Sequence, residues 1–174
     1  MIAEAKRLLE SVIKKTAPEL TVVKSAAEEA RQIMARKFPF AALITNPGNF
    51  DSNAARTVRY FEGEGAGRKY IERYIRGVRS VPVLIRVWAE GEDHADDLLS
   101  RVIPELPAQW EYGGFTGRVE INTEEHSDHA GSMSKPYCSV VEVTFSGTAA
   151  RAPREVPVIE KVENSGGEFA AKSV

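Results

Sequence analysis

Residues 81–89, VPVLIRVWA, give the clearest strand signal in this sequence. Small or branched apolar residues occupy the odd positions from Val81 to Ala89, whereas Leu84, Arg86 and Trp88 occupy the even positions between them. Side chains of a strand point alternately to its two faces, so one face of this segment is apolar and the other is mixed. The segment therefore predicts a central strand of a sheet with a buried face.

The residues before this segment predict more strands. Residues 69–76 also alternate, and the short connection that contains Gly77 predicts a long antiparallel hairpin between 69–76 and 81–89. A run with three glycines, Gly63 to Gly67, predicts the tip of another hairpin, formed by 57–61 with 69–76. Further strands are predicted at 20–23, 38–45, 117–122 and 137–146.

Three segments show the apolar spacing of amphipathic helices. Residues 2–15 form the first, and Ser25 with Glu28 predicts a capping box at the start of the second. A third helix follows residue 89, with Asp93 as the expected cap and Pro104 at its end. The predicted fold class is α+β: a mostly antiparallel sheet covered on one side by two to three helices, with an extended C-terminal arm.

The length of 174 residues favours one main domain. We expect this domain to span residues 1–146 and residues 147–174 to form the extended arm, with a short extended piece around Val158 as its only strand.

Composition limits the compartment and the covalent chemistry. With one cysteine, Cys138, the chain forms no internal disulfide. No apolar run approaches the roughly 20 residues of a membrane-spanning helix, and the charged first residues do not resemble an export signal. The expectation is a protein without a membrane partner, assembled in the cytoplasm.

Charge is distributed in blocks, although the net charge is only −2. Residues 1–37 and 51–90 each hold eight Lys/Arg against five Asp/Glu, whereas residues 91–130 hold two against ten. Opposite potentials on different faces favour head-to-tail association of identical subunits. The alternative is that these blocks are ordinary solvated surfaces.

Motifs for catalysis or cofactor binding are weak. The glycines of 63–67 lack the Lys-Ser/Thr pair and the following helix of a phosphate loop. Residues 124–129, EEHSDH, hold five potential metal ligands in six positions, but a solvated loop is the favoured interpretation over a metal site. No nucleophile motif is present, so we expect no enzyme activity, no metal and no cofactor.

Cations and tyrosines are concentrated on the strands from 56 to 86. Together with Tyr60, Tyr70 and Tyr74, these cations could follow a nucleic-acid backbone. Alternatively, they could pair with the acidic residues of 91–128 in the same or the next subunit, and the net charge of −2 favours this second interpretation. The candidate interface residues, for subunit, tube or connector contacts, are Arg56, Arg59, Arg68, Lys69, Arg73, Arg76, Arg79 and Val158.

The order of these segments resembles a known family. A Phe-Pro strand at 37–44 (KFPFAALI) leads to the strand at 81–87, then to an acidic helix that closes with IPELP at 103–107, and the last strand includes VVEVTF at 140–145. Over residues 1–146 this pattern is similar to the tail terminator (tail completion) proteins of tailed bacteriophages and prophages, in particular the Mu-like and lambda-like forms.

That resemblance implies a structural virion protein without an active site. Such proteins form a ring, commonly a homohexamer, that caps the tail-tube protein, ends tube polymerisation and offers a docking face for the head-neck connector. The resemblance implies a place at the neck end of the virion tail, possible contacts with sheath and connector proteins, and DNA that passes through the lumen without sequence-specific binding. Exposed strand edges, with the C-terminal arm added to a neighbour's sheet, would join the subunits.

Three alternatives stay open at this point. A head-tail connector or neck ring protein has the same surface requirements as a terminator. A nucleic-acid-binding module would use the Arg/Tyr strands of 56–86, and a metal-dependent enzyme would use residues 124–129.

Overall fold

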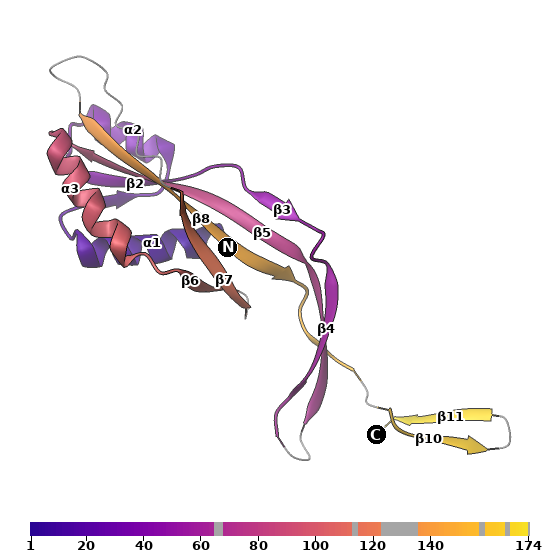
Figure 1. The fold of residues 1–174 in the computed structure, drawn as a ribbon. Coiled ribbons are helices and arrows are strands. Elements are labelled where there is room, and N and C mark those ends of the chain that lie inside the picture. The colour runs from indigo at the N-terminus through magenta and orange to yellow at the C-terminus, as the bar shows by residue number, and fades with distance from the viewer. Residues whose placement is uncertain (65–67, 113–114, 123–135, 157–158, 166–167, 174) are drawn as a thin grey trace. The chain divides into compact units, whose positions relative to one another are not determined.

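A computed structural model describes residues 1–64, 68–112, 115–122, 136–156, 159–165 and 168–173 (Figure 1). The chain divides into two compact units. Unit 1 comprises Met1–Phe50 and Arg79–Thr148, and unit 2 comprises Asp51–Val78 and Ala149–Val174.

The sheet of unit 1 confirms the predicted, mostly antiparallel architecture. Its pairings β2–β5, β6–β7 and β7–β8 are antiparallel, and the edge pair β1–β2 is parallel. The strand order is β1 (Thr21–Val23), β2 (Phe40–Thr45), β5 (Lys69–Ala89), β8 (Tyr137–Ala150), β7 (Phe115–Asn122) and β6 (Gln109–Tyr112).

The three predicted helices are present as α1 (Ile2–Thr16), α2 (Ala26–Met34) and α3 (Glu92–Val102), and α3 continues into a 3₁₀ turn at Ile103–Glu105. The capping box of α2 is confirmed. Ser25 Oγ accepts a hydrogen bond from the Glu28 amide at 3.2 Å, and Glu28 Oε2 accepts one from the Lys24 amide at 3.0 Å. The predicted cap of α3 is wrong by two residues, because Gly91 is the N-cap and Asp93 lies in the first turn.

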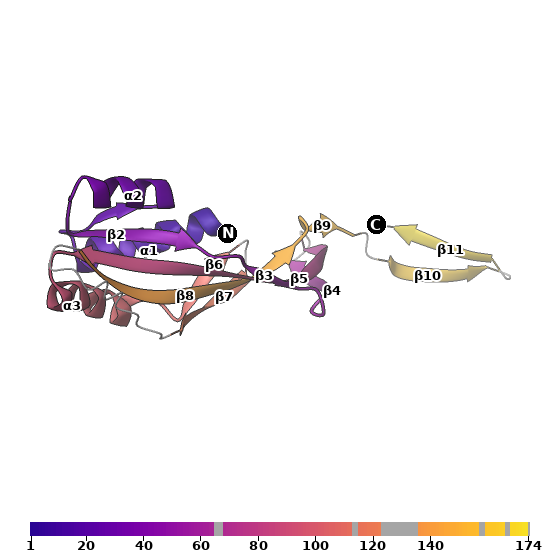
Figure 2. The ribbon, with the colours of Figure 1, turned by 90° about the horizontal axis from the view of Figure 1, so that it is seen from above.

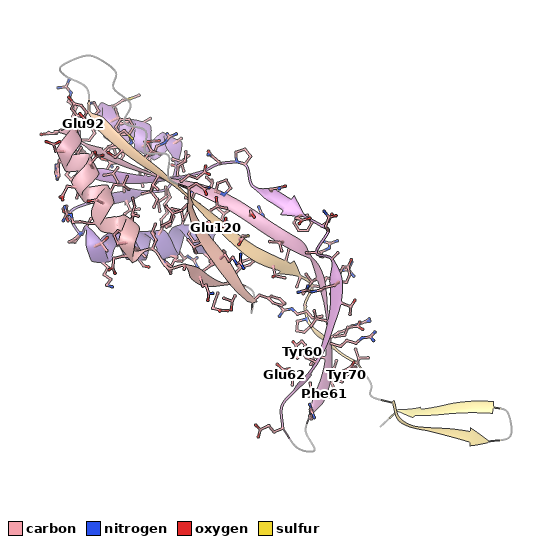
Figure 3. The ribbon with its side chains drawn as sticks, in the orientation of Figure 1. Tyr60, Phe61, Glu62, Tyr70, Glu92 and Glu120 are labelled. Carbon is pink, nitrogen blue, oxygen red and sulfur yellow. The ribbon has the colours of Figure 1, made fainter. Side chains whose placement is uncertain are left out.

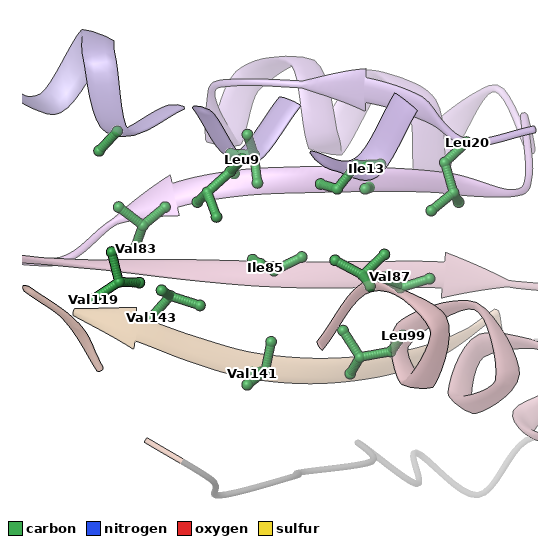
Figure 4. Packing of buried hydrophobic residues seen from close by; sticks show 14 of the residues in the cluster. Leu9, Ile13, Leu20, Val83, Ile85, Val87, Leu99, Val119, Val141 and Val143 are labelled. Carbon is green, nitrogen blue, oxygen red and sulfur yellow. The ribbon is translucent and has the colours of Figure 1, made fainter. Parts of the chain in front are cut away.

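Helices α1 and α3 cover one face of the sheet and pack against each other. Their buried leucine, isoleucine and valine side chains meet those of β2, β5, β7 and β8 in the main core (Figure 4). Burial of this apolar surface is the principal stabilising term of the unit. The members labelled in the figure are Leu9, Ile13, Leu20, Val83, Ile85, Val87, Leu99, Val119, Val141 and Val143.

Helix α2 packs on the opposite face of the sheet (Figure 2), so two helices, not three, share the covered face. A second cluster there includes Phe40 and Trp88. At its centre Glu29, 5% exposed, accepts hydrogen bonds from Trp88 Nε1 at 2.8 Å and from Arg86 at 3.3 Å. This buried carboxylate keeps both donors satisfied and fixes α2 on the sheet.

The predicted hairpin between 69–76 and 81–89 is wrong, because both segments belong to the single strand β5. Gly77 has a φ of 157° and does not reverse the chain. β5 is a continuous strand because neighbours supply hydrogen bonds along it: β4 (Arg56–Glu62) pairs with its first part and β2 with its last part. The hairpin predicted around 63–67 is confirmed by the β4–β5 pairing, which runs to Glu62 opposite Lys69.

Residues after the predicted end of the last strand contain more structure than expected. β8 continues to Ala150, and β9 (Arg154–Glu155) pairs with β5. β10 (Ile159–Ser165) and β11 (Glu168–Ser173) form an antiparallel pair, where we expected one short extended piece. Val158 lies outside the described residues.

An ion-pair cluster around Glu10 of α1 makes an acid-sensitive contribution to the stability of the folded protein. Glu10 accepts a hydrogen bond from Lys14 at 2.7 Å and lies 2.5 Å from the ammonium group of Lys24. The hydrogen bonds from Lys14 and Lys24 lower the pKa of Glu10 from 4.5 to about 2. A carboxyl group whose pKa is lowered in the folded state stabilises the folded protein at pH values above its pKa in the unfolded chain. This stabilisation is lost as the pH falls through its pKa in the folded state.

The variant Glu10→Gln should therefore be less stable than the wild-type protein at pH 7, and the difference should disappear between about pH 4.5 and pH 2. Urea unfolding followed by circular dichroism across this range measures the difference in free energy of unfolding. A difference that stays constant from pH 7 to pH 2 would contradict the assigned ion pairs.

Candidate interaction surface

Unit 2 contains a three-stranded sheet with β5 at its centre. β4 pairs with one edge of β5, from Arg56 opposite Ile75 to Glu62 opposite Lys69. β9 also pairs with β5, with Glu155 opposite Ile71 and Arg154 opposite Glu72. Main-chain bonds from the Arg151 amide to Tyr74 (2.9 Å) and from the Val156 amide to Tyr70 (2.8 Å) extend this second pairing.

The register sorts the side chains onto two faces, because directly opposite residues lie on the same side of a sheet. One face holds the buried Ile71 and Ile75 with Val58 and Tyr60. The other, which we call the aromatic–cation face, consists of Arg59, Phe61, Arg68, Tyr70, Glu72, Tyr74, Arg151 and Arg154.

At the middle of the aromatic–cation face one carboxylate joins three strands. Glu72 on β5 accepts hydrogen bonds from Arg59 Nε on β4 and from Arg154 Nε on β9, both at 2.9 Å. The Arg154 guanidinium, followed by that of Arg59, lowers the pKa of Glu72 below its ordinary value. This charge clamp fixes the two outer strands to β5.

Aromatic rings flank the clamp, and guanidinium groups lie over two of them. The Phe61 and Tyr70 rings are 4.9 Å apart, near the closed end of the hairpin (Figure 3). Arg68 lies 3.9 Å from the Phe61 ring centre, and Arg151 lies 5.5 Å from that of Tyr74. Phe61 is 47% exposed and Tyr74 41% exposed. Aromatic side chains with neighbouring arginines are the typical composition of the energetic centre of a protein interface.

The structure brings several of the predicted interface residues together on unit 2. Arg59 and Arg68 are on the aromatic–cation face, Lys69 pairs with Glu155 at 2.9 Å, and Arg73 lies on β5 opposite Val58. In the described part of the chain, the exposed cations Arg56, Arg76 and Arg79 have no ion-pair partner, and Arg79 belongs to unit 1 rather than unit 2.

The prediction that these cations pair with residues 91–128 is wrong for Arg59, Lys69 and Arg86 within this chain. Their partners are Glu72, Glu155 and Glu29. The contributions of Phe61, Arg151 and Arg154 to this face were not predicted from the sequence, because they depend on the register of β4, β5 and β9. A composition signal existed: Arg151 and Arg154 are the only cations of residues 147–160.

Helix α3 and the following 3₁₀ turn form an acidic surface on unit 1. This segment, 92–105, holds five carboxylates against one arginine. A surface pocket of about 260 Å³, which we call the α3 pocket, is lined by Asp96, Leu99, Ser100, Ile103 and Pro104. Asp96 accepts a hydrogen bond from Ser139 and is the only titratable group among the described residues that line this pocket.

The two units differ in charge. Unit 1 has 13 Lys/Arg against 17 Asp/Glu, a net charge of −4, and unit 2 has ten against eight, a net charge of +2. The acidic block 91–130 lies in unit 1 and most of the basic block 51–90 lies in unit 2, whereas the basic block 1–37 belongs to unit 1. The opposite net charges of the two units favour attraction between unit 1 of one molecule and unit 2 of another.

Comparison with known proteins adds no assignment: no family model matches the chain, and no curated protein matches it significantly. Among the residues that the structure describes, no helix is long and apolar enough to cross a membrane. The candidate metal ligands at 124–129 lie outside the described residues.

Proposed function

We propose that this chain is a structural subunit of a ring that caps a bacteriophage-type tail tube, ends its polymerisation and offers a docking face for the head-neck connector. The observation that carries the proposal is the aromatic–cation face of unit 2. It combines exposed rings and arginines on a unit whose charge is opposite to that of unit 1. The sequence pattern that resembles tail terminator proteins supports the choice of a tail-capping ring.

Association of unlike faces is the property a ring requires. A contact between two different surfaces of identical subunits is heterologous, and it closes into a ring when the rotation per subunit divides a full turn. The outer edges of β4 and β9 are additional sites where a neighbouring chain could add a strand. In this account the subunit needs surfaces of defined polarity and no reaction centre.

A connector or neck ring is the closest rival, because it would use the same surfaces. The nucleic-acid alternative is less favoured, since Arg59 and Arg154 already pair with Glu72 instead of offering their charge to phosphate groups. The net charge of −2 also differs from the excess positive charge of dedicated nucleic-acid binders.

Assembly of tail-tube subunits from the same genome, with and without this protein, tests the proposal. Electron microscopy of negatively stained samples measures the tube lengths and shows the tube ends. We expect shorter tubes that carry this protein at one end. The control variant Met34→Ser changes an exposed residue outside the aromatic–cation face, and it should give the same tube lengths as the wild-type protein. Tubes of unchanged length with bare ends would overturn the proposal, and binding to connector rings alone would support the neck protein instead.

A further inference from the structure

We propose that the aromatic–cation face of one copy docks on the α3 pocket of the next copy, with Phe61 as the apolar anchor. This inference rests on the proposed function and names the two surfaces that would join the ring. The partner is a second copy of this chain, because the complementary surface is present on the same molecule.

Shape and polarity of the pocket fit an aromatic anchor. Leu99, Ile103 and Pro104 supply an apolar lining, and the volume of about 260 Å³ accommodates one aromatic ring. Phe61 offers such a ring at the hairpin end of unit 2 and is 47% exposed. Transfer of this ring from water into an apolar site is favourable. Arg68 and Tyr70 contact the ring and leave 47% of the Phe61 side chain exposed.

Charge complementarity surrounds this anchor. The aromatic–cation face has four arginines against Glu72, and the α3 segment 92–105 has five carboxylates against Arg101. Asp93 and Asp96 are exposed on this helix. Docking would bring Arg68, next to Phe61, toward these carboxylates. In this contact a basic surface meets an acidic one, and no two surfaces of the same charge face each other.

The contact is directional, with unit 2 of one copy on unit 1 of the next. In an open chain of copies, only the two end copies therefore keep an unused surface, and closure of the ring joins these two surfaces. The proposal also explains the acidic character of α3, because the carboxylates of Asp93 and Asp96 would serve as the charged rim of the docking site.

Cysteine cross-linking between two protein populations tests the contact. One population carries Glu64→Cys, at an exposed position of the hairpin that keeps Phe61 intact, and the other carries Ser100→Cys; they are mixed with tube subunits under mild oxidation. Because each protein has one new thiol and the native Cys138 is only 5% exposed, a mixed disulfide reports contact between copies and not within one chain. The matched control replaces Ser100→Cys by Ser11→Cys, an exposed serine on α1.

We expect the 64/100 mixture to yield at least about tenfold more covalent dimer than the 64/11 control, and the yield to fall as salt screens the charges. Adding Phe61→Ser or Arg68→Glu to the Glu64→Cys protein should reduce the yield. A yield equal to the control, or cross-linking of Glu64→Cys only to itself or to tube subunits, would overturn the proposal. Tube capping without a 64/100 product would refute this contact alone, whereas a 64/100 product without tube capping would refute the proposed function.

Discussion

Gly117→Val should lower the free energy of unfolding of unit 1 by about 3–5 kcal/mol, which is a large part of the stability of an ordinary domain. A Cβ atom at position 117 would collide with the carbonyl oxygen of Ser146 and lie 2.5 Å from Trp110 Nε1. Trp110 is 7% exposed, donates a hydrogen bond to that same carbonyl at 2.8 Å and packs edge-on against Phe145. The larger residue would displace the indole ring, so overpacking and a lost buried hydrogen bond add together.

Urea unfolding followed by tryptophan fluorescence measures this effect. The matched control is Gly91→Ala, because no atom lies within 4 Å of a Cβ atom at that position. Gly91 is the N-cap of α3, where alanine is a poorer cap than glycine, so we expect a loss below about 1 kcal/mol. Equal losses in the two variants would show that the close approach of Gly117 to Trp110 has no energetic importance.

Glu72→Lys should release β9 from β5. The substitution places a cation between Arg59 and Arg154, so two attractive contacts become repulsive across neighbouring strands. We expect the protection of the Arg151 and Val156 amides against hydrogen exchange to fall about tenfold or more, because these amides donate to Tyr74 and Tyr70 of β5. Hydrogen exchange followed by mass spectrometry of peptides that cover residues 149–156 measures this loss.

Glu64→Lys is the control for this experiment, since it makes the same change in net charge at an exposed position of the same hairpin. The amides of Arg151 and Val156 should keep wild-type protection in this variant. If both variants lose protection equally, the net charge of unit 2 and not the clamp at Glu72 holds the third strand. Acidification should weaken the clamp in the wild-type protein as well, because protonation of Glu72 removes its charge below the lowered pKa.

Most of the fold followed from local patterns in the sequence. The helices, the capping box at Ser25 and the strands around 38–45 and 137–146 have periodicity or end signals that act over a few residues. The continuity of β5 could not be predicted from local patterns. Gly77 is compatible with a turn, but β4 pairs with β5 before this residue and β2 pairs with β5 after it, so the chain continues as one strand. The position of α2 on the opposite face depends on Glu29 and Trp88, which meet only in the tertiary structure.

The candidate surface was predicted in part. A concentration of cations at 56–79 pointed to unit 2, and Arg59, Arg68 and Lys69 do lie there. Their partners could not be read from the sequence, because cross-strand neighbours depend on register and on β9, a strand of two residues between prolines. Residues far apart in the chain, such as Arg59 and Arg154, become neighbours only through Glu72.

We propose that copies of this chain assemble into a ring at the end of a tube. Electron cryomicroscopy of tube ends, with two-dimensional averages and a reconstruction, is the decisive experiment. We expect one closed ring of identical subunits, seated on the last layer of the tube and containing density that matches unit 1 and unit 2. Tube ends without this density, while the protein stays in solution as single copies of 19.2 kDa, would refute the proposal.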